Sequence, residues 1–368
     1  MKYLSRICGS ALLLGAALIL SIGVTLPAHA QTAGVEIYFI DTEGGAATLI
    51  ITPSRESILI DCGSPGDRDA MRIAHVAKDV AHLKQIDNLI ITHWHLDHYG
   101  GTGPLANLIP IVHFWNKGIP DKTLDDPEHF ETLMAAYKKA SKNTSTAIHV
   151  GDTIPVTRPT GTEEFSLKCL IANKQTQPDD PDPKVKNYYG RLHKPQPEDL
   201  SDNANSLGFL LSYGYFRFLD LGDLTWNLEY KLVTPNDKVG MIDVYQSTHH
   251  GIDQSNNPVI LKTLRPIVAV INNGPHKGGT LQLFQNLLGL GSLQAIYEQH
   301  RNVDVTLPTD LLDKKLYVAN PEEQCKAEFI HIQVAQDSRT YHVSIGERGS
   351  PQQYKTRLVP APEPPTSK

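Results

Sequence analysis

The chain has 368 residues, of which 40% are hydrophobic and 20% are charged. This balance is typical of a globular protein and excludes a wholly disordered or collagen-like chain. The formal net charge of −6 argues against tight binding of duplex DNA, because such binding depends on clustered Lys and Arg side chains. The net charge does not exclude a nucleotide or a short phosphodiester as the substrate.

The N-terminus has the pattern of an export signal. Lys2 and Arg6 precede an apolar stretch that runs from Ala11 to about Leu26, and Ala28-His29-Ala30 fits the small-residue cleavage pattern. We therefore expect residues 1–30 to be a signal peptide, cleaved after Ala30, and the mature protein to be periplasmic or secreted. The alternative is a retained membrane anchor, for which the stretch is short.

Export implies an oxidising compartment, and the mature chain holds Cys62, Cys169 and Cys325. None of them belongs to a C-x-x-C motif, so the sequence does not indicate a thiolate zinc site. A disulfide between Cys169 and Cys325 is one interpretation. Three thiols packed as small hydrophobic groups are the other.

The first part of the chain alternates strand and helix patterns. It begins with strands predicted at Val35–Asp41, Ala47–Thr52 and Ser57–Asp61, then an amphipathic helix at Asp67–Leu83 and a short apolar strand at Asn88–Thr92. It continues with a strand near Ile111–Trp115, a helix near Glu128–Ala140 and a strand near Glu164–Ala172.

A long insertion follows at about residues 174–205. It is rich in Pro, Asp, Lys and Asn and shows no periodicity, so it is either disordered or a functional loop. Its middle, Lys184–Lys194, combines basic and aromatic side chains that would suit the lining of a substrate pocket. A solvated insertion is the alternative.

Strands resume after the insertion. The later elements are a hairpin of Leu207–Leu211 and Phe216–Leu221, strands at Asp243–Thr248 and Ile267–Asn272, a short helix at Val259–Leu264, and a late hairpin of Glu328–Val334 and Thr340–Ile345. Residues 349–368 are expected to form a disordered tail. Two blocks of strands with helices between and outside them indicate one α/β domain of packed layers, spanning residues 31–348.

The strongest chemical signal is Thr92-His93-Trp94-His95-Leu96-Asp97-His98. Four potential metal ligands fall within six residues, directly after an apolar strand. Alternate residues of an extended segment point the same way, so His93 and His95 can hold one ion. Asp97 and His98, which come after the chain turns, would face a second position.

This H-x-H-x-D-H block resembles the signature of the metallo-β-lactamase superfamily. The superfamily also carries an Asp after an early strand, here Asp61, a Gly-Asp after a later strand, here Gly222-Asp223, and a late His, here within His249-His250-Gly251. These motifs occur in the superfamily's order across residues 35–275. The resemblance implies a four-layer αβ/βα sandwich with two metal ions at one edge of its two sheets.

Within the superfamily the chain is most similar to the ComEC-type subgroup, whose secreted relatives include phosphorylcholine esterases. The likeness rests on Phe39-Ile40-Asp41 followed by Gly44-Gly45, on Asn205-Ser206-Leu207, and on His249-His250-Gly251 with Ser255 close behind. It implies a ligand set in which Asp97 is also a catalytic residue: His93, His95, Asp97, His98, His250 and a bridging Asp223.

Three further assignments come with this resemblance. Many members place another His before the later hairpin, where Asp202 or Asn203 could substitute here as an oxygen ligand. Further candidates for the missing ligand, none of them in a motif, are His113, His129, His149 and His193. If His250 binds the second ion, His249 would face the substrate and protonate the leaving oxygen. Asp61 would orient a ligand His through its ring N–H.

The predicted function is an exported binuclear metal-dependent hydrolase of phosphoester or phosphodiester bonds. The ligands suit two zinc ions, with manganese or iron as alternatives, and a hydroxide bridging the ions would attack near neutral pH. The substrate would be a small anion, which Lys277 or His276 could meet unless their Gly-rich loop is a plain turn. The alternatives are a lactam, lactone or thioester hydrolase and a non-catalytic metal-binding extracellular protein. The sequence leaves the oligomeric state open.

Overall fold

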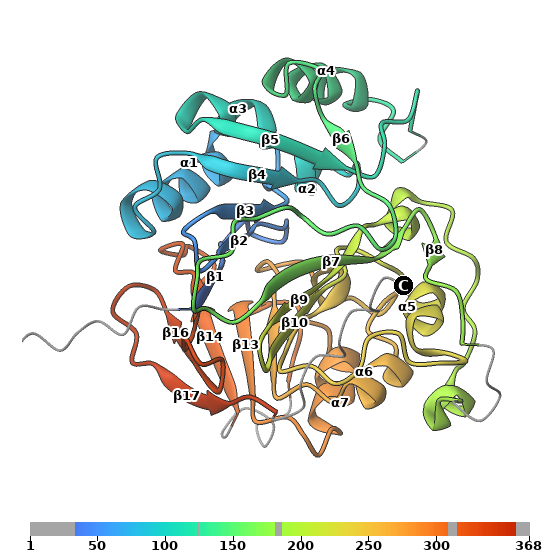
Figure 1. The fold of residues 1–368 in the computed structure, drawn as a ribbon. Helices are drawn as coiled ribbons and strands as arrows, with labels where there is room; N and C mark the ends of the chain where they lie inside the picture. Colours follow the sequence, from blue (N-terminus) through green and yellow to red (C-terminus); the bar gives the residue numbers. More distant parts are fainter. Residues whose placement is uncertain (1–33, 124, 181–185, 308–314, 358–368) are drawn as a thin grey trace, which may run out of the picture. The chain divides into compact units, whose positions relative to one another are not determined.

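The computed structural model describes residues 34–123, 125–180, 186–307 and 315–357, which belong to one compact unit (Figure 1). The predicted signal peptide and its cleavage site after Ala30 lie outside these residues. No helix in the described ranges is both long and apolar enough to cross a membrane.

Two large sheets organise the described residues (Figure 1). The first sheet has, in spatial order, β17 (Gln352–Lys355), β16 (Thr340–Ile345), β15 (Ile330–Val334), β1 (Val35–Phe39), β2 (Thr48–Ile51), β3 (Ser57–Ile60), β4 (Ile86–Ile90), β5 (Ile111–Asn116) and β6 (Thr146–Ala147). The second sheet has β14 (Leu316–Asn320), β13 (Ala295–His300), β12 (Val268–Ile271), β11 (Val244–Gln246), β10 (Phe216–Asp220), β9 (Gly208–Tyr213), β7 (Phe165–Ala172) and β8 (Gln175–Thr176).

The sheets pack face to face, and helices cover the outer face of each. Alternation along a strand decides which face a side chain joins: Ile37 and Phe218 lie in the core between the sheets, whereas their neighbours Tyr38 and Leu219 pack toward the helices. The helices on the first sheet are α1 (Asp67–His75), α3 (Thr102–Leu108) and α4 (Phe130–Ala140), and those on the second are α5 (Trp226–Val233), α6 (Pro258–Leu264) and α7 (Leu281–Leu288). This arrangement confirms the predicted four-layer αβ/βα sandwich.

One expectation about the chain is wrong, and the choice between two interpretations of the cysteines is settled. Part of the predicted disordered tail forms β17, which pairs with β16 because Tyr354 packs on Tyr341 with ring centroids 5.4 Å apart and shares a 2.9 Å hydrogen bond with Tyr297. Of the two interpretations of the cysteines, free thiols hold: Cys62 and Cys169 are buried, Cys325 is partly exposed, and no disulfide joins Cys169 and Cys325. The last residues of the tail, 358–368, lie outside the described residues.

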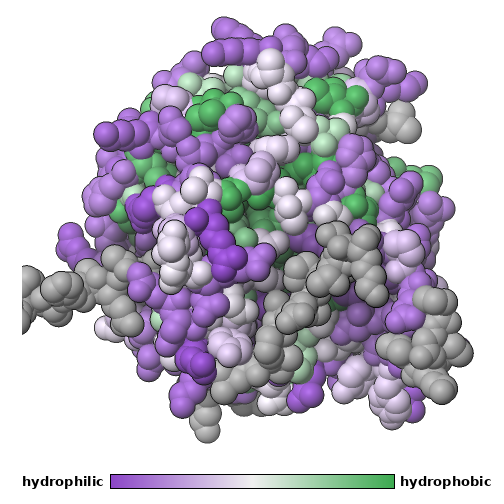
Figure 2. All heavy atoms as spheres, viewed as in Figure 1, coloured by the Kyte–Doolittle hydropathy of each residue, from purple (hydrophilic) through white to green (hydrophobic). Residues whose placement is uncertain are grey.

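The described parts of the insertion are held against the second sheet's helices. The side-chain amide of Asn187 donates to the carbonyl of Val233 at 2.7 Å and to the hydroxyl of Thr263 at 2.8 Å, which ties the insertion to α5 and α6. Figure 2 shows one face of the molecule, on which hydrophilic side chains predominate and apolar ones gather mainly over the α3, α4 and β5 region. No part of the described insertion forms a long regular element.

Candidate metal centre

The predicted ligands lie at one edge of the two sheets, where strands of both sheets end. One group follows β4, on the adjoining loop and on α2 (Leu96–Tyr99): His93, His95, Asp97 and His98. Asp223 follows β10 of the other sheet, and His249 and His250 follow β11. The amide of His249 donates to the carbonyl of Gly222 at 3.0 Å, so the last two loops are joined.

Asp61 fixes the orientation and the proton of His98. Its Oδ2 accepts hydrogen bonds from Nδ1 of His98 and from the hydroxyl of Thr92, both at 2.7 Å, and its Oδ1 accepts from the Thr92 amide at 2.8 Å. Because Nδ1 of His98 carries a proton, Nε2 is the nitrogen that can bind a metal ion, which would take the place of any proton on that atom. Asp61 therefore lies where a residue that orients a ligand His must lie.

His250 is fixed in the same tautomer. Its Nδ1 donates to the carbonyl of Asn272 at 3.2 Å, so Nε2 again keeps a lone pair. That nitrogen lies 3.3 Å from Nε2 of His98, 3.2 Å from Oδ2 of Asp223 and 3.4 Å from Oδ2 of Asp97. Nε2 of His98 is itself 3.2 Å from Oδ2 of Asp223.

Four potential metal-ligating atoms thus converge, and they repel one another unless a proton or a metal cation lies among them. Two overlapping groups of potential ligands result, each with its atoms within 4.8 Å of one another: Asp97, His98 and His250, and His93, His98 and Asp223. The residues present at this edge therefore fit a metal centre of nitrogen and carboxylate ligands.

The two late histidines adopt a strained backbone. His249 has φ 55° and His250 has φ 54°, in the left-handed region that costs a non-glycine residue about 1–3 kcal/mol. The carbonyl of His250 accepts a hydrogen bond from the Gly279 amide at 2.9 Å. A Cβ atom at Gly278 would lie 2.0 Å from that carbonyl oxygen, so only glycine fits there. The strained turn brings two adjacent imidazoles to one carboxylate.

His93 joins the centre, whereas His95 stands apart. The Thr92 hydroxyl gives its proton to Asp61, so its oxygen accepts from Nδ1 of His93 at 3.1 Å. Nε2 of His93 is buried, has no hydrogen-bond partner among the described residues and lies 4.0 Å from Oδ2 of Asp223. Nε2 of His95 instead faces Asp125 at 3.3 Å, and its ligand role stays a prediction.

Asp202 stabilises the loop that carries His93 and His95 and does not point into the ligand groups. One carboxylate oxygen accepts the Trp94 amide at 2.7 Å, and the other pairs with Lys117 at 2.8 Å and accepts from Asn205 at 3.1 Å. Both oxygens are therefore occupied, and Asp202 belongs to neither group of converging ligands. The geometry does not favour the ligand role predicted for it. Asn203 lies nearer, with its amide nitrogen 3.2 Å from Nε2 of His249.

Hydrogen bonds also fix the proton of His249. The Ser255 hydroxyl donates to the carbonyl of Leu224 at 2.8 Å, so its oxygen accepts from Nδ1 of His249 at 3.3 Å. Nε2 of His249 then keeps a lone pair, which accepts the side-chain amide of Asn203 at 3.2 Å and lies 3.4 Å from Oδ2 of Asp223. Burial, with His250 nearby, lowers the pKa of His249 to about 4. The position of Nε2 beside Asp223 makes His249 a candidate ligand, and its role as an acid stays a prediction.

The charges of the centre are strongly coupled. Burial alone would lower the pKa of His98, but the carboxylates of Asp223, Asp61 and Asp97 outweigh it and raise that pKa well above its usual range. Burial raises the pKa of Asp223, but the neighbouring imidazoles, led by that of His250, hold it well below its usual range. The buried carboxylates thus stay ionised and demand positive charge beside them.

Lys277 reaches the centre and His276 does not. Nζ of Lys277 lies 2.5 Å from Oδ2 of Asp97, while the Lys277 side chain stays 42% exposed. The ring of His276 is paired with Asp304 at 2.9 Å and Glu323 at 3.1 Å on the surface. Of the two residues predicted to meet an anion, only Lys277 is placed beside the ligand groups.

Replacing Asp61 with asparagine is expected to weaken the second ion roughly 10- to 100-fold, because the ring of His98 would lose the carboxylate that holds its proton on Nδ1. Competition with a chromogenic chelator measures this affinity. Asp87→Asn, which alters a surface carboxylate bonded to Ser57, is the control and should bind metal like the wild type. Unchanged affinity in Asp61→Asn would contradict the role assigned to that contact.

Glu229 holds the segment that follows the late histidines. Its carboxylate accepts the amides of Asn256 at 3.0 Å and Asn257 at 2.8 Å, and burial raises its pKa to about 7 from 4.5. The folded state therefore holds this proton more tightly, so unfolding free energy should fall by up to roughly 3 kcal/mol as pH rises from about 5 to about 8. Urea unfolding at both pH values should show that the unfolding free energy of Glu229→Gln falls less than that of the wild type between these two pH values. Equal falls in both proteins would contradict the assignment.

With this geometry established, comparison with known proteins is informative. Residues 41–200 match the model of the metallo-β-lactamase superfamily. The match covers the H-x-H-x-D-H segment and supports the assignment to that superfamily. An atrochrysone carboxyl ACP thioesterase of Aspergillus fumigatus is 36% identical over 66 residues, which are 18% of this chain and 20% of that protein. The chain thus matches about a fifth of this curated relative's length.

Solved structures show more distant similarity. CmlA, a diiron β-hydroxylase from Streptomyces venezuelae, is 14% identical with a TM-score of 0.38, over 65% of this chain and 45% of that one. A putative Zn-dependent hydrolase of the metallo-β-lactamase superfamily from Thermotoga maritima is 13% identical with a TM-score of 0.32, over 77% and 97%.

The structure also holds chemistry that the sequence analysis missed. His300 ends β13, which was not predicted, and lies buried beside Asp41 and Cys325. No local spacing marks these three residues, because they come from distant parts of the chain.

Proposed function

We propose that the protein is an exported binuclear metal-dependent hydrolase of phosphoester bonds, of the ComEC-type subgroup. The observation that supports it most is the convergence of the Nε2 atoms of His98, His249 and His250 on the buried Asp223 carboxylate. His93 and His95 would hold the first ion, and Asp97, His98 and His250 the second, with Asp223 between them. The lone pair on His249 makes this residue the candidate for the nitrogen ligand missing near Asp202.

The chain's own groups would do the following. Two divalent ions bound here would supply Lewis acidity and lower the pKa of a bound water toward 7. Asp61 and the carbonyl of Asn272 hold the proton of each imidazole away from the centre. Lys277, already beside Asp97, offers its ammonium group to an anionic oxygen of the substrate. The ammonium group of Lys277 would attract a substrate that carries one or two negative charges.

A cavity of about 570 Å³ adjoins the loops of the centre. It is lined by residues of the insertion and of the segments after Asp223 and before Ser255: Gln196, Pro197, Glu198, Asp199, Thr225, Trp226, Asn227, Asp253 and Gln254. Three carboxylates and an indole suit a cationic group, because carboxylates attract it and aromatic faces bind quaternary ammonium. We infer that the substrate is a phosphoester whose alcohol is cationic, as in phosphorylcholine.

A panel of chromogenic substrates tests this proposal on the metal-reconstituted mature protein. p-Nitrophenyl phosphorylcholine should be turned over faster than bis-p-nitrophenyl phosphate, and Asp199→Asn should reduce that preference without reducing metal content. A higher rate on nitrocefin, a lactone or an acyl thioester would overturn the phosphoester assignment. No turnover of any substrate by protein carrying both ions would favour a non-catalytic metal-binding role.

Thioester hydrolysis is the second candidate, because the curated relative is named as an ACP thioesterase. The chain matches only 66 residues of that relative, so the panel has to decide between the two. Export is a separate part of the proposal and rests on the N-terminal pattern alone. Sequencing of protein recovered from the periplasm or medium should find Gln31 at its N-terminus.

A further inference from the structure

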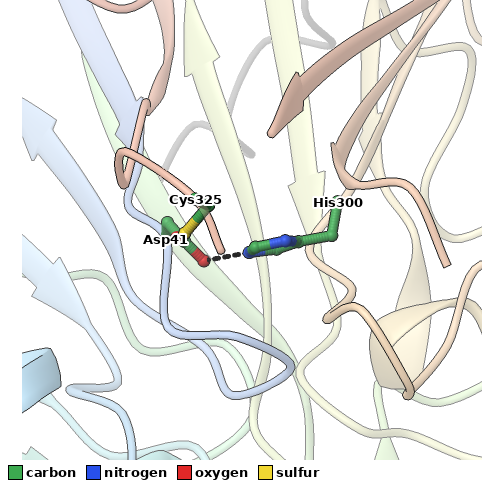
Figure 3. A group of neighbouring side chains, drawn as sticks. All are labelled: Asp41, His300 and Cys325. Atoms are coloured by element: carbon green, nitrogen blue, oxygen red, sulfur yellow. Dashed lines mark hydrogen bonds and ion pairs between the residues drawn. The ribbon is translucent and has the colours of Figure 1, made fainter. Parts of the chain in front are cut away.

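A second cluster of metal-ligating side chains lies apart from the ligand groups of the candidate metal centre. Figure 3 shows Asp41, which follows β1, His300, which ends β13, and Cys325, which lies on the segment before β15. Asp41 and His300 are fully buried, and Cys325 is partly exposed. A carboxylate oxygen, an imidazole nitrogen and a sulfur of these residues all lie within 4.8 Å of one another.

The carboxylate of Asp41 lies between the other two groups (Figure 3). Its Oδ1 is 2.6 Å from Nε2 of His300, and its Oδ2 is 3.2 Å from Sγ of Cys325. Nδ1 of His300 is buried and has no hydrogen-bond partner within the described part of the chain. The contact with the Asp41 carboxylate, which can only accept, places the imidazole proton on Nε2. Because no bond holds Nδ1, the proton can move there when a cation takes its place on Nε2.

The surroundings balance the charge of such a cation. Arg72 pairs with Asp41 at 2.9 Å and with Glu43 at 2.8 Å, and its guanidinium lies 3.6 Å from Sγ of Cys325. Arg72 and Glu43 neutralise each other, which leaves the Asp41 carboxylate and a Cys325 thiolate to neutralise one divalent ion. Burial and the Asp41 carboxylate raise the pKa of the Cys325 thiol and the guanidinium only partly offsets them, so the metal ion itself has to displace the thiol proton.

We propose that Asp41, His300 and Cys325 form a mononuclear site for a thiophilic divalent cation such as zinc. One oxygen, one nitrogen and one sulfur ligand are a set that zinc accepts at distances of about 2.0–2.3 Å. Binding replaces the proton of the thiol, which passes to the solvent, and the metal–sulfur bond forms in its place. The sequence offered no C-x-x-C motif, and the site needs none because its ligands come from three separate segments.

The position of this site suggests a structural role. The amide of Glu43 donates to Oδ1 of Asp41 at 2.9 Å, and the amide of Ala46, farther along the same loop, donates to the carbonyl of Asp97 at 3.1 Å. A cation on Asp41 would therefore anchor the loop that packs against the backbone of Asp97. The proposal does not depend on which bond the candidate metal centre hydrolyses.

Cobalt spectroscopy tests the site on the full mature chain, kept reduced with a phosphine. Ligands of the metal centre supply only nitrogen and oxygen, so a near-ultraviolet thiolate-to-cobalt charge-transfer band can come only from a cysteine. Wild-type protein saturated with Co²⁺ should show this band, and Cys325→Ser should lose it together with one bound ion. Cys169→Ala, which removes a buried thiol bonded only to a backbone carbonyl, should keep both.

Two further variants separate metal binding from folding. Asp41→Asn and His300→Gln should each lower the zinc content of the saturated protein by one ion, while Cys325→Ser retains the wild-type circular dichroism spectrum. Absence of the charge-transfer band in the wild type, or its persistence in Cys325→Ser, would overturn the proposal. Loss of metal from the other centre through Asp223→Ala should leave the band unchanged, so failure of one site is distinguishable from failure of the other.

Discussion

Asp223→Ala is expected to remove both ions of the centre and to lower kcat/KM for a phosphodiester by roughly a thousandfold or more. The reason is that Oδ2 of Asp223 lies within 3.4 Å of Nε2 of His98, His249 and His250, so this one oxygen is placed to contact ions on both sides of the centre. A loss of several kcal/mol of transition-state stabilisation corresponds to a change of that size. Elemental analysis and steady-state kinetics on the same preparation measure both effects.

Asp220→Asn is the matched control for this change. Asp220 is a buried carboxylate three residues earlier, and its Oδ1 accepts the Gly222 amide at 2.9 Å. It belongs to neither ligand group among the described residues. The control should keep both ions and most of its activity. Retention of one tightly bound ion in Asp223→Ala would contradict the bridging position of that carboxylate.

His249→Ala and His250→Ala are expected to lose different ions. His250→Ala should lose the ion held with Asp97 and His98, whereas His249→Ala should lose the ion held with His93. Each variant should lose more than the 10- to 100-fold in metal affinity that is typical when a residue hydrogen-bonded to a ligand is replaced. Ser255→Ala, which removes the hydroxyl that accepts Nδ1 of His249, should show that smaller effect.

The alternative role of His249 gives a different pattern. A general acid would keep the metal and lose rate by roughly 100- to 10,000-fold, with the greater loss on an alkyl phosphoester, because nitrophenolate needs little protonation to leave. Metal content measured beside kcat on both substrates distinguishes the two roles. Full metal content in His249→Ala with a selective loss on the alkyl substrate would refute the ligand role.

The layered fold followed from local patterns wherever those patterns were simple. Strand Ser57–Ile60 contains three consecutive apolar residues, and α1 repeats its apolar residues at helical spacing. β13 was missed because its end is buried yet polar: Glu298 bonds Asn273, and His300 bonds Asp41. Hydropathy cannot reveal a strand whose polar side chains are satisfied by distant partners.

Some features of the metal centre could likewise be predicted from the sequence, and others could not. The residues from His93 to His98 were predictable, because four potential ligands lie within one short segment and form a recognisable motif. The hydrogen bond of Asp202 with Trp94 and its ion pair with Lys117 were not predictable, since both depend on how a loop docks against another sheet. The proton positions of His249 and His250 likewise depend on contacts that only the folded chain supplies.

Stepwise metal titration tests the central claim most directly. Metal-free Cys325→Ser protein, which lacks the proposed thiolate site, is titrated with Zn²⁺ while bis-p-nitrophenyl phosphate hydrolysis is recorded. The binuclear account predicts two tightly bound equivalents, with activity rising mainly as the second one binds. Full activity after a single equivalent, or phosphodiester hydrolysis that persists in the metal-free protein, would contradict it.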